Sequence, residues 1–193
     1  MRLFTAVLPP PPAAAELAAA VGALQALPGA DRLRWTPAEG RHITLAFLGE
    51  VDEDLLPELR ERFGRAARRH RPFDARLAGG GRFGDRVLWA GVADGRTALR
   101  ALADSVSAGA RRTGVPIEDR PYRPHLTVAR ARAGRAPGAR RTDLRPFADA
   151  LADFSGSAWR AGELTLVRSR LPVSGVSGDR PRYETLEVWP LGH

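Results

Sequence analysis

The residues best suited to chemistry form a short pattern that occurs twice in the chain. His42-Ile43-Thr44-Leu45-Ala46 reappears as His125-Leu126-Thr127-Val128-Ala129, and each copy reads His, apolar, Thr, apolar, Ala. Two of the four histidines of the chain take part. Composition alone would place such a continuation after a given histidine roughly one time in a hundred. Two copies therefore indicate a single site to which both contribute.

The alternation within each copy is typical of a β-strand that has one polar and one apolar face. Successive side chains of a strand point to opposite faces, so His42 and Thr44 share one face, as do His125 and Thr127. The apolar residues between them occupy the other face. Each copy thus presents an imidazole beside a hydroxyl on one side and anchors itself in a core through the other.

Two imidazoles that face one cavity are suited to phosphoryl transfer by general acid and base catalysis. Histidine titrates near pH 6.5, so a neutral ring can take a proton from water while a protonated ring gives one to the leaving oxygen. The hydroxyls of Thr44 and Thr127 can donate to the non-bridging phosphate oxygens. Threonine is a poor zinc ligand and no carboxylate or cysteine set completes a metal site, so we expect neither metal nor cofactor.

The composition excludes several other chemistries. The 193 residues include no cysteine and no lysine, which excludes thiol nucleophiles, zinc ribbons, Schiff-base lysines and Walker-type phosphate loops. The length fits one domain, residues 1–193, that is divided into two lobes. The net charge of +8 comes entirely from arginine, which indicates either a polyanionic partner or biased codon usage.

The apolar and turn patterns predict the elements that must position the two motifs. We expect helices over 13–27, 52–69 and 96–112. We expect strands over 2–8, 33–35, 41–48, 73–77, 87–92, 125–130, 157–160, 163–168 and 183–189.

The same patterns predict the connections and the fold class. Gly79-Gly80-Gly81 should open a hairpin loop over 79–85, residues 131–142 should form a mobile basic loop, and residues 172–181 should connect the last two strands. No strand carries the long apolar run of a buried parallel sheet, which favours an α+β fold with largely antiparallel sheets. The apolar run at the N-terminus stops at Pro9, too short for a signal peptide or a membrane span, so we expect a cytoplasmic protein.

Two segments resemble the signatures of the 2H phosphoesterases. They are Arg41-His42-Ile43-Thr44-Leu45-Ala46-Phe47-Leu48-Gly49-Glu50 and Tyr122-Arg123-Pro124-His125-Leu126-Thr127-Val128-Ala129-Arg130. Within that superfamily they are most similar to the bacterial and archaeal RNA 2′,3′-cyclic phosphodiesterases, formerly called 2′-5′ RNA ligases. The likeness extends to Leu3-Phe4-Thr5-Ala6 near the start and to Tyr183 and Trp189-Pro190-Leu191 near the end.

The resemblance implies two pseudo-symmetric lobes of antiparallel sheet, with helices on the outer faces and the motif strands facing each other across a central groove. It implies hydrolysis of a terminal 2′,3′-cyclic phosphate to a 2′-phosphate, with RNA ligation as a reverse-type activity. By resemblance His42 is the proton donor and His125 the acceptor, although the sequence itself does not fix that order. The implied partners are RNA ends, tRNA fragments included, and we expect a monomer.

Three further residues are candidates for substrate binding. Arg130 occupies a position where the family often has a basic residue, but its odd offset from His125 puts it on the opposite face unless a bulge intervenes. Phe47 has the same offset from His42, and its alternative is an ordinary core aromatic. Tyr122 could stack on a base or pack beside Pro124.

Two other functions remain open at this point. The same chemistry could act on a small nucleotide rather than on RNA, or the chain could be an RNA-binding module without catalysis. Two titrating groups with intact threonine partners favour an enzyme, since a binding module has no need of them. The remaining histidines, His70 and His193, are predicted to be a solvated helix end and a chain terminus.

Overall fold

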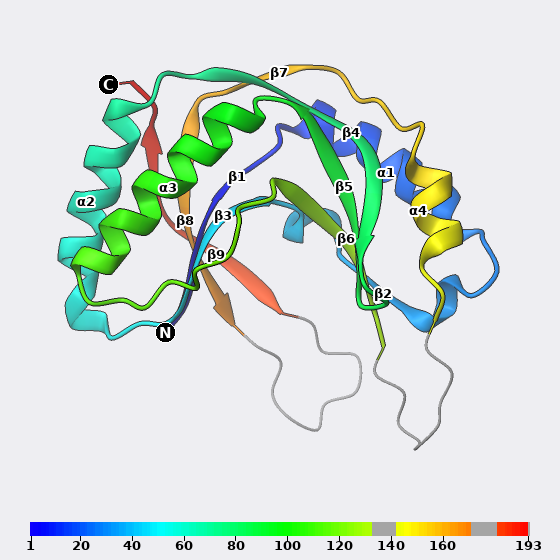
Figure 1. Ribbon diagram of the computed structural model, residues 1–193, viewed down its shortest axis with the longest axis horizontal. Helices are drawn as coiled ribbons and strands as arrows, with labels where there is room; N and C mark the ends of the chain where they lie inside the picture. The colour runs from blue at the N-terminus through cyan, green and yellow to red at the C-terminus, as the bar shows by residue number, and fades with distance from the viewer. Residues whose placement is uncertain (133–141, 171–180, 193) are drawn as a thin grey trace.

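One curved sheet of antiparallel strands runs through the protein, and helices lie along both flanks of the resulting arch (Figure 1). The structure is a computed structural model and describes residues 1–132, 142–170 and 181–192. The predicted α+β class with antiparallel pairing is confirmed. No helix within these ranges is long and apolar enough to cross a membrane.

The elements follow in a mixed order along the chain. The helices are α1 (Pro11–Gln25), α2 (Leu56–Arg69), α3 (Arg96–Arg112) and α4 (Arg145–Leu151), with short 3₁₀ turns at Ala30–Arg32, Ala38–Gly40 and Glu53–Leu55. The strands are β1 (Arg2–Val7), β2 (Leu33–Trp35), β3 (Ile43–Glu50), β4 (Phe73–Phe83), β5 (Val87–Asp94), β6 (His125–Ala131), β7 (Trp159–Ala161), β8 (Glu163–Arg170) and β9 (Arg182–Pro190).

The sheet consists of two halves that meet at its centre. The strand order is β7-β4-β5-β6-β3-β1-β8-β9, with β2 added to β6. Strands β3 and β6 are joined by one residue pair, Ile43 with Leu126, whereas the strands within each half pair over longer stretches. We call the half from β3 to β9 the first lobe and the half from β6 to β7 the second lobe. The two motifs therefore lie on the strands where the lobes meet.

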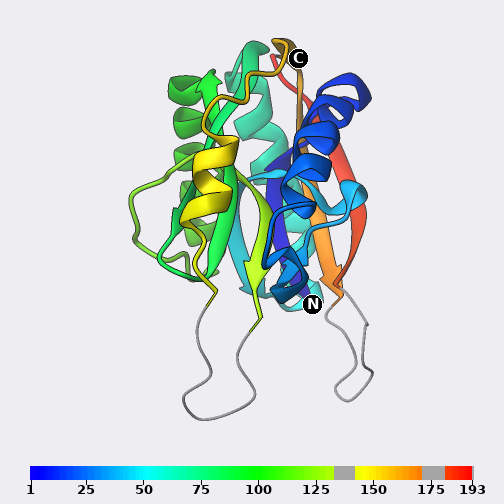
Figure 2. The same ribbon diagram turned by 90° about the vertical axis from the view of Figure 1, so that its right-hand side faces the viewer.

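Helices close the apolar side of each lobe. In the first lobe α2 and α3 pack against each other and against β3 and β9, and α3 buries Leu99, Leu102 and Val106 along one face. In the second lobe α4 packs against β4 and β5, and α1 packs against α4 (Figure 2). Apolar residues at helical spacing thus hold the convex side of the sheet in a dry core and leave the motif side open.

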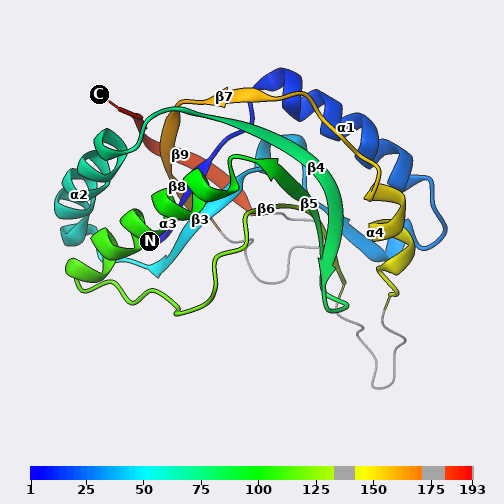
Figure 3. The same cartoon turned by 45° about the horizontal axis from the view of Figure 1, so that its top comes forward.

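Connections between the lobes pass over the closed side of the arch. β4 starts near the end of α2 in the first lobe and ends in the second, with β7 beside its first residues (Figure 3). The helix α1 follows β1 of the first lobe but packs against α4 of the second. The helix α3 follows β5 of the second lobe but packs against β3 of the first. Each lobe is therefore assembled from segments that are separated in the sequence.

Most predicted elements are confirmed, with boundaries that shift by a few residues. The helix over 96–112 has the predicted bounds. The first helix begins at Pro11 rather than 13, because proline has no amide hydrogen to lose in the first helical turn. The helix predicted over 52–69 is a 3₁₀ turn followed by α2.

Two predictions about the second lobe are wrong. The expected loop over 79–85 is largely strand, since β4 continues through its three glycines to Phe83. These glycines let neighbours approach closely: a Cβ added at Gly80 would lie 2.6 Å from Leu151, and one at Gly81 would lie 2.4 Å from Trp89. The sequence pattern also omits helix α4, because its seven residues are too few for a recognisable period.

The two long connections predicted from the sequence lie mostly outside the described residues. Of the basic loop over 131–142, the structure describes only Ala131, which ends β6, Arg132 and Thr142. Of the connection over 172–181, it describes only Pro181. The terminal His193 is also outside the described residues.

Candidate active site

The two motifs meet crosswise at the junction of the lobes. Ile43 pairs with Leu126 in an antiparallel register, which places His42 opposite Thr127 and Thr44 opposite His125. The residues between them, Ile43 and Leu126, are fully buried. Each motif thus contributes a histidine and a threonine to the same face, and the structure brings together all four residues predicted to be catalytic.

Each imidazole is held by a carbonyl two residues before it. Nδ1 of His125 lies 2.6 Å from the carbonyl oxygen of Arg123, so Nδ1 is protonated and donates this hydrogen bond. His42 makes the equivalent bond with the backbone of Gly40. In His125 this arrangement leaves Nε2 free to exchange a proton with a substrate.

Aromatic rings fix the orientation of both imidazoles. The His42 ring stacks on Phe4, with 4.4 Å between the ring centroids, and meets the Tyr183 ring edge-on at 5.3 Å. The His125 ring meets Phe83 edge-on at 4.8 Å. Such contacts restrict rotation of the imidazoles without adding a charge.

Bulges in the motif strands bring Phe47 and Arg130, each five residues after a motif histidine, back to the histidine face. Pairing with β1 skips Leu45 in β3, and pairing with β5 skips Val128 in β6. Each bulge shifts the alternation by one residue, so Phe47 and Arg130 face the same space as the motif histidines. Phe47 is 48% exposed, which rules out the alternative that it is a core aromatic. The two motifs therefore share the position of a bulge as well as a sequence pattern.

The shared space is a groove of about 640 Å³ that is lined by cations. Besides the four motif residues it contains Arg2, Arg86, Arg120 and Arg130, the rings of Phe4, Phe47, Phe83 and Tyr183, and Ser169. Among the described residues that line it there is no carboxylate. We call this space the catalytic groove. Its charge suits a polyanionic ligand.

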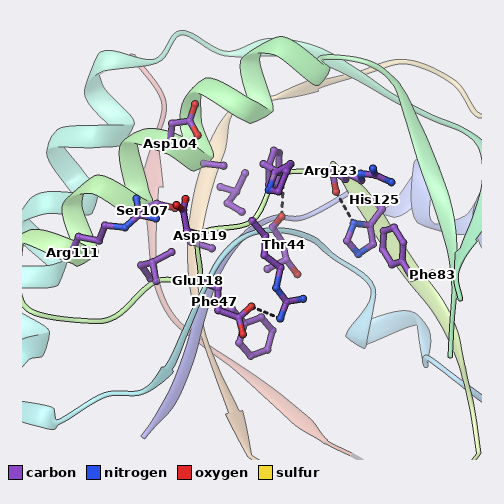
Figure 4. A pocket seen from close by; sticks show the side chains of 17 residues that line it. Thr44, Phe47, Phe83, Asp104, Ser107, Arg111, Glu118, Asp119, Arg123 and His125 are labelled. Carbon is purple, nitrogen blue, oxygen red and sulfur yellow. Dashed lines mark hydrogen bonds and ion pairs between the residues drawn. The ribbon is translucent and has the colours of Figure 1, made fainter.

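A second cavity of about 670 Å³ adjoins the catalytic groove (Figure 4). The two share Thr44, Phe47, Phe83, Arg120 and His125. The adjoining cavity also carries carboxylates, Asp104, Glu118 and Asp119, and the last two come from the segment before β6 (Figure 4). Its mixed charge makes it less suited to phosphate than the catalytic groove is.

Tyr122 lies in this adjoining cavity and links the two motifs. Its hydroxyl donates a 3.0 Å hydrogen bond to the carbonyl oxygen of Thr44 (Figure 4). Burial raises the pKa of this phenol above its usual range, so it stays protonated and keeps the bond. The ring lines the cavity, while the hydroxyl ties the approach of β6 to β3.

At neutral pH the lowered pKa values of both imidazoles favour their neutral forms in the ligand-free protein. Burial lowers the pKa of His42 to about 4, the charges of His125 and Arg130 lower it further, and the bond to Gly40 opposes the change. Burial also lowers the pKa of His125, the hydrogen bond to Arg123 opposes this, and Arg130 adds to it. A bound phosphate would place negative charge beside these groups and favour protonation of one of them.

Sequence reasoning missed the residues that surround the histidines from other strands. Arg2 and Phe4 come from β1 and Tyr183 comes from β9, and all three line the catalytic groove. Alternation along β1 puts Arg2 and Phe4 on one face, but only the strand order shows that this face borders His42. Of the other histidines, His70 does end α2 as predicted, but it is half-buried rather than fully solvated, and its Nε2 lies 2.8 Å from the hydroxyl of Ser105 on α3.

The groove can perform proton transfer at a phosphate with its own side chains. His42, Thr44, His125 and Thr127 line it together with four arginines. Within the described ranges no three His, Asp or Glu side chains gather in a way that could hold a metal ion.

Comparisons with known proteins point to one family. The family model described as the 2′-5′ RNA ligase superfamily matches residues 9–171. The RNA 2′,3′-cyclic phosphodiesterase of Thermus thermophilus is 34% identical, with 99% of this chain and 90% of that protein covered. The protein of the same name from Geobacillus stearothermophilus is 32% identical over 81% of this chain, and the match spans 47% of that relative's length.

A solved structure agrees with the fold over its whole length. The crystal structure of TT0787 of Thermus thermophilus is 33% identical and superimposes with a TM-score of 0.74, covering 100% of this chain and 98% of that one. The overlap includes both motif strands and both lobes. The likeness thus extends well beyond the short motifs.

Proposed function

Because the chain belongs to the 2′-5′ RNA ligase superfamily, we propose that it hydrolyses the terminal 2′,3′-cyclic phosphate of RNA to a 2′-phosphate. The observation that carries the proposal is the crosswise meeting of two His-Thr pairs in a groove lined by arginines. The names of the relatives support the same substrate class. The enzyme would be a phosphodiesterase that works by general acid and base catalysis.

The proposed reaction assigns a role to each motif residue. Nε2 of His125 accepts a proton from water, whose oxygen attacks phosphorus, and His42 donates a proton to the departing 3′ oxygen of the ribose. The P–O3′ bond breaks and the phosphate remains on O2′. Thr44 and Thr127 donate hydrogen bonds to the non-bridging oxygens, where charge accumulates. With the 5′-hydroxyl of another RNA end in place of water as the nucleophile, the same groups would open the cyclic phosphate into a 2′-5′ diester as the P–O3′ bond breaks, which accounts for ligation.

The acid must acquire its proton against the low pKa of His42. The phosphate is the only anion that this scheme brings into the groove, and its charge offsets the effects of burial and of Arg130. Arg130 would in turn bind a non-bridging oxygen. Phe47, with half of its ring exposed, and the ring of Tyr122 would pack against the nucleoside.

The arrangement of the groove also bears on the domain organisation, the oligomeric state and the cellular location of the enzyme. One chain supplies both motifs to one groove, which supports a single bilobal domain over residues 1–193 that acts as a monomer. RNA ends, tRNA fragments included, are cytoplasmic substrates, so we place the enzyme in the cytoplasm.

The test is hydrolysis of a cyclic-phosphate-ended oligonucleotide and of nucleoside 2′,3′-cyclic phosphates in the presence of EDTA, followed by phosphorus NMR. We expect EDTA-resistant formation of a 2′-phosphate. His42→Ala and His125→Ala should each lower turnover by about 10²–10⁴-fold and change RNA affinity only a few-fold. His70→Ala is the matched control, because His70 lies between α2 and α3, outside the groove.

The outcomes separate this function from its alternatives. Turnover of cyclic nucleotides with no advantage for the oligonucleotide would identify a small-nucleotide phosphodiesterase. RNA binding without turnover, unchanged by either histidine substitution, would contradict catalysis and leave an RNA-binding module.

A further inference from the structure

Arg2 is a cation of the catalytic groove to which the proposed reaction gives no role. Its guanidinium carbon lies 5.5 Å from the centroid of the Phe47 ring, and the group lines the groove. Its Nε atom is buried and has no hydrogen-bond partner among the described residues. The four N–H groups on its two terminal nitrogens are then the donors that this arginine can offer to a ligand in the groove.

The strand register places two hydroxyl groups beside Arg2. In β1 and β8, Leu3 pairs with Arg168 in an antiparallel register, so Arg2 lies opposite Ser169. In β8 and β9, Ser169 pairs with Tyr183. The side chains of Arg2, Ser169 and Tyr183 all line the catalytic groove. They form a row across three strands, which we call the Arg2 row.

The charges around the Arg2 row favour an anion. Burial raises the pKa of Tyr183, and the charges of Arg130 and Arg2 oppose that rise, so both guanidinium groups lie near this phenol. The carboxylate opposite Arg2 on β3 is that of Glu50, which forms an ion pair with the amino group of Met1 at 3.6 Å and is 72% exposed. The described residues that line the groove include no carboxylate to neutralise the row.

The row lies one step along the strand from the catalytic histidines. Arg2 and Phe4 share a face of β1, and two strand residues span about 7 Å. The Phe4 ring in turn stacks on His42. The distance between successive phosphates of an RNA strand is comparable with that step.

We propose that the Arg2 row binds a second phosphate of the substrate, the 5′-phosphate of the nucleotide that carries the cyclic phosphate. This inference rests on the proposed function. With the cyclic phosphate between the two motifs, a second phosphate of the same nucleotide would reach Arg2, Ser169 and Tyr183. In RNA this phosphate belongs to the diester that joins the last nucleotide to the one before it. The groove would therefore distinguish an RNA end from a free nucleoside cyclic phosphate by its charge, before any base is read.

The test compares adenosine 2′,3′-cyclic phosphate with the same compound carrying an additional 5′-phosphate. For the wild-type protein, kcat/KM should be about 10- to 100-fold higher with the 5′-phosphate, as expected for hydrogen bonds from a charged donor. In Arg2→Gln this ratio should fall to within a few-fold of one. Arg2→Lys keeps the charge but loses the planar guanidinium, so its ratio should lie between that of the wild type and that of Arg2→Gln. Because each ratio is taken within one variant, a general loss of activity cancels.

Two other arginine-to-glutamine variants test whether the second phosphate binds at Arg2 rather than elsewhere. Arg65→Gln removes the same charge from the exposed face of α2 and should keep the wild-type ratio. Arg86→Gln removes it from the second-lobe end of the groove. A ratio that falls in Arg86→Gln but not in Arg2→Gln would overturn the proposal, as would equal kcat/KM for the two substrates in the wild type.

A binding measurement keeps this inference separate from the proposed function. Calorimetry with adenosine 3′,5′-bisphosphate and with adenosine 3′-phosphate should show a loss of affinity in Arg2→Gln for the bisphosphate only. If the wild type hydrolyses neither of these two substrates nor the cyclic-phosphate-ended oligonucleotide, the proposed function fails. The calorimetry then still decides whether the Arg2 row holds a second phosphate, because equal losses for both ligands would contradict it.

Discussion

At the scale of single residues, the two histidines share both their geometry and a charged neighbour. Each ring is bonded to a carbonyl two residues before it, and each packs against an aromatic ring from another strand. Arg130 lowers the pKa of both. One guanidinium therefore acts on the acid and the base at once, and helps to keep both neutral until an anion arrives.

Replacing Arg130 by glutamine should raise the pKa of both His42 and His125 in the ligand-free protein, because a positive neighbour disfavours protonation of each imidazole. The measurement is the pH titration of the Cε1–H signals by NMR, which is tractable with four histidines in the chain. Arg65→Gln is the control and should leave both titrations in place. Unchanged pKa values for both rings in Arg130→Gln would show that the charge of Arg130 does not act on them.

The two residues that lie five positions after the motif histidines could not be placed on the correct face from the sequence alone. Alternation alone places Phe47 and Arg130 on the core side, and both lie in the groove because a bulge intervenes in each strand. A bulge depends on the register between two strands, and β5 and β6 are separated by an entire helix in the sequence. The motif histidines and threonines needed no such information, since the alternation is regular up to the bulge.

At the scale of elements, periodicity was sufficient where an element is long. The seventeen residues of α3 repeat an apolar face often enough to be placed with correct bounds, whereas the seven of α4 do not. The glycines of β4 predict a loop because glycine is usual in turns. In the fold they serve close packing, since a Cβ at Gly80 would lie 2.6 Å from Leu151 of α4 and one at Gly81 would lie 2.4 Å from Trp89 of β5.

The link between the motif strands can be tested by separating the two parts of Tyr122. Tyr122→Phe removes only the hydrogen bond to the Thr44 carbonyl, and should lower the free energy of unfolding by about 1 kcal/mol and reduce kcat with little change in KM. Tyr122→Leu also removes the ring from the adjoining cavity and should raise KM. Chemical denaturation and steady-state kinetics measure the two effects. An unchanged KM in Tyr122→Leu would exclude a substrate contact through the ring.

At the scale of the whole molecule, the burial of His42 in the groove makes the folded protein less stable at acid pH. The pKa of His42 is about 4 in the folded protein and near 6.5 in an unfolded chain. Between these values the unfolded chain binds a proton that the folded protein does not, so stability falls as the pH drops from about 6.5 to 4. The shift corresponds to about 3 kcal/mol.

We therefore expect His42→Asn to reduce the acid sensitivity of the fold. Urea denaturation at pH 7 and at pH 4 should show that the wild type loses about 3 kcal/mol more than the variant over this range. The comparison between the two proteins cancels the contributions of carboxylates, which titrate in both. Parallel losses in the two proteins would mean that His42 is protonated as readily in the fold as outside it.

The exchange of helices between the lobes determines how the protein unfolds and how it responds to proteolysis. Because α1 and α3 each pack in the lobe opposite to the strand that precedes them, a cut near the middle of the chain leaves each lobe short of a helix or a strand. Neither half of the chain contains a whole lobe that could fold alone. The lobes should therefore melt in a single cooperative transition, and limited proteolysis should yield no stable half-molecule. An ancestor with only one motif would have had to pair with a second copy of itself and trade helices with it to build the same groove.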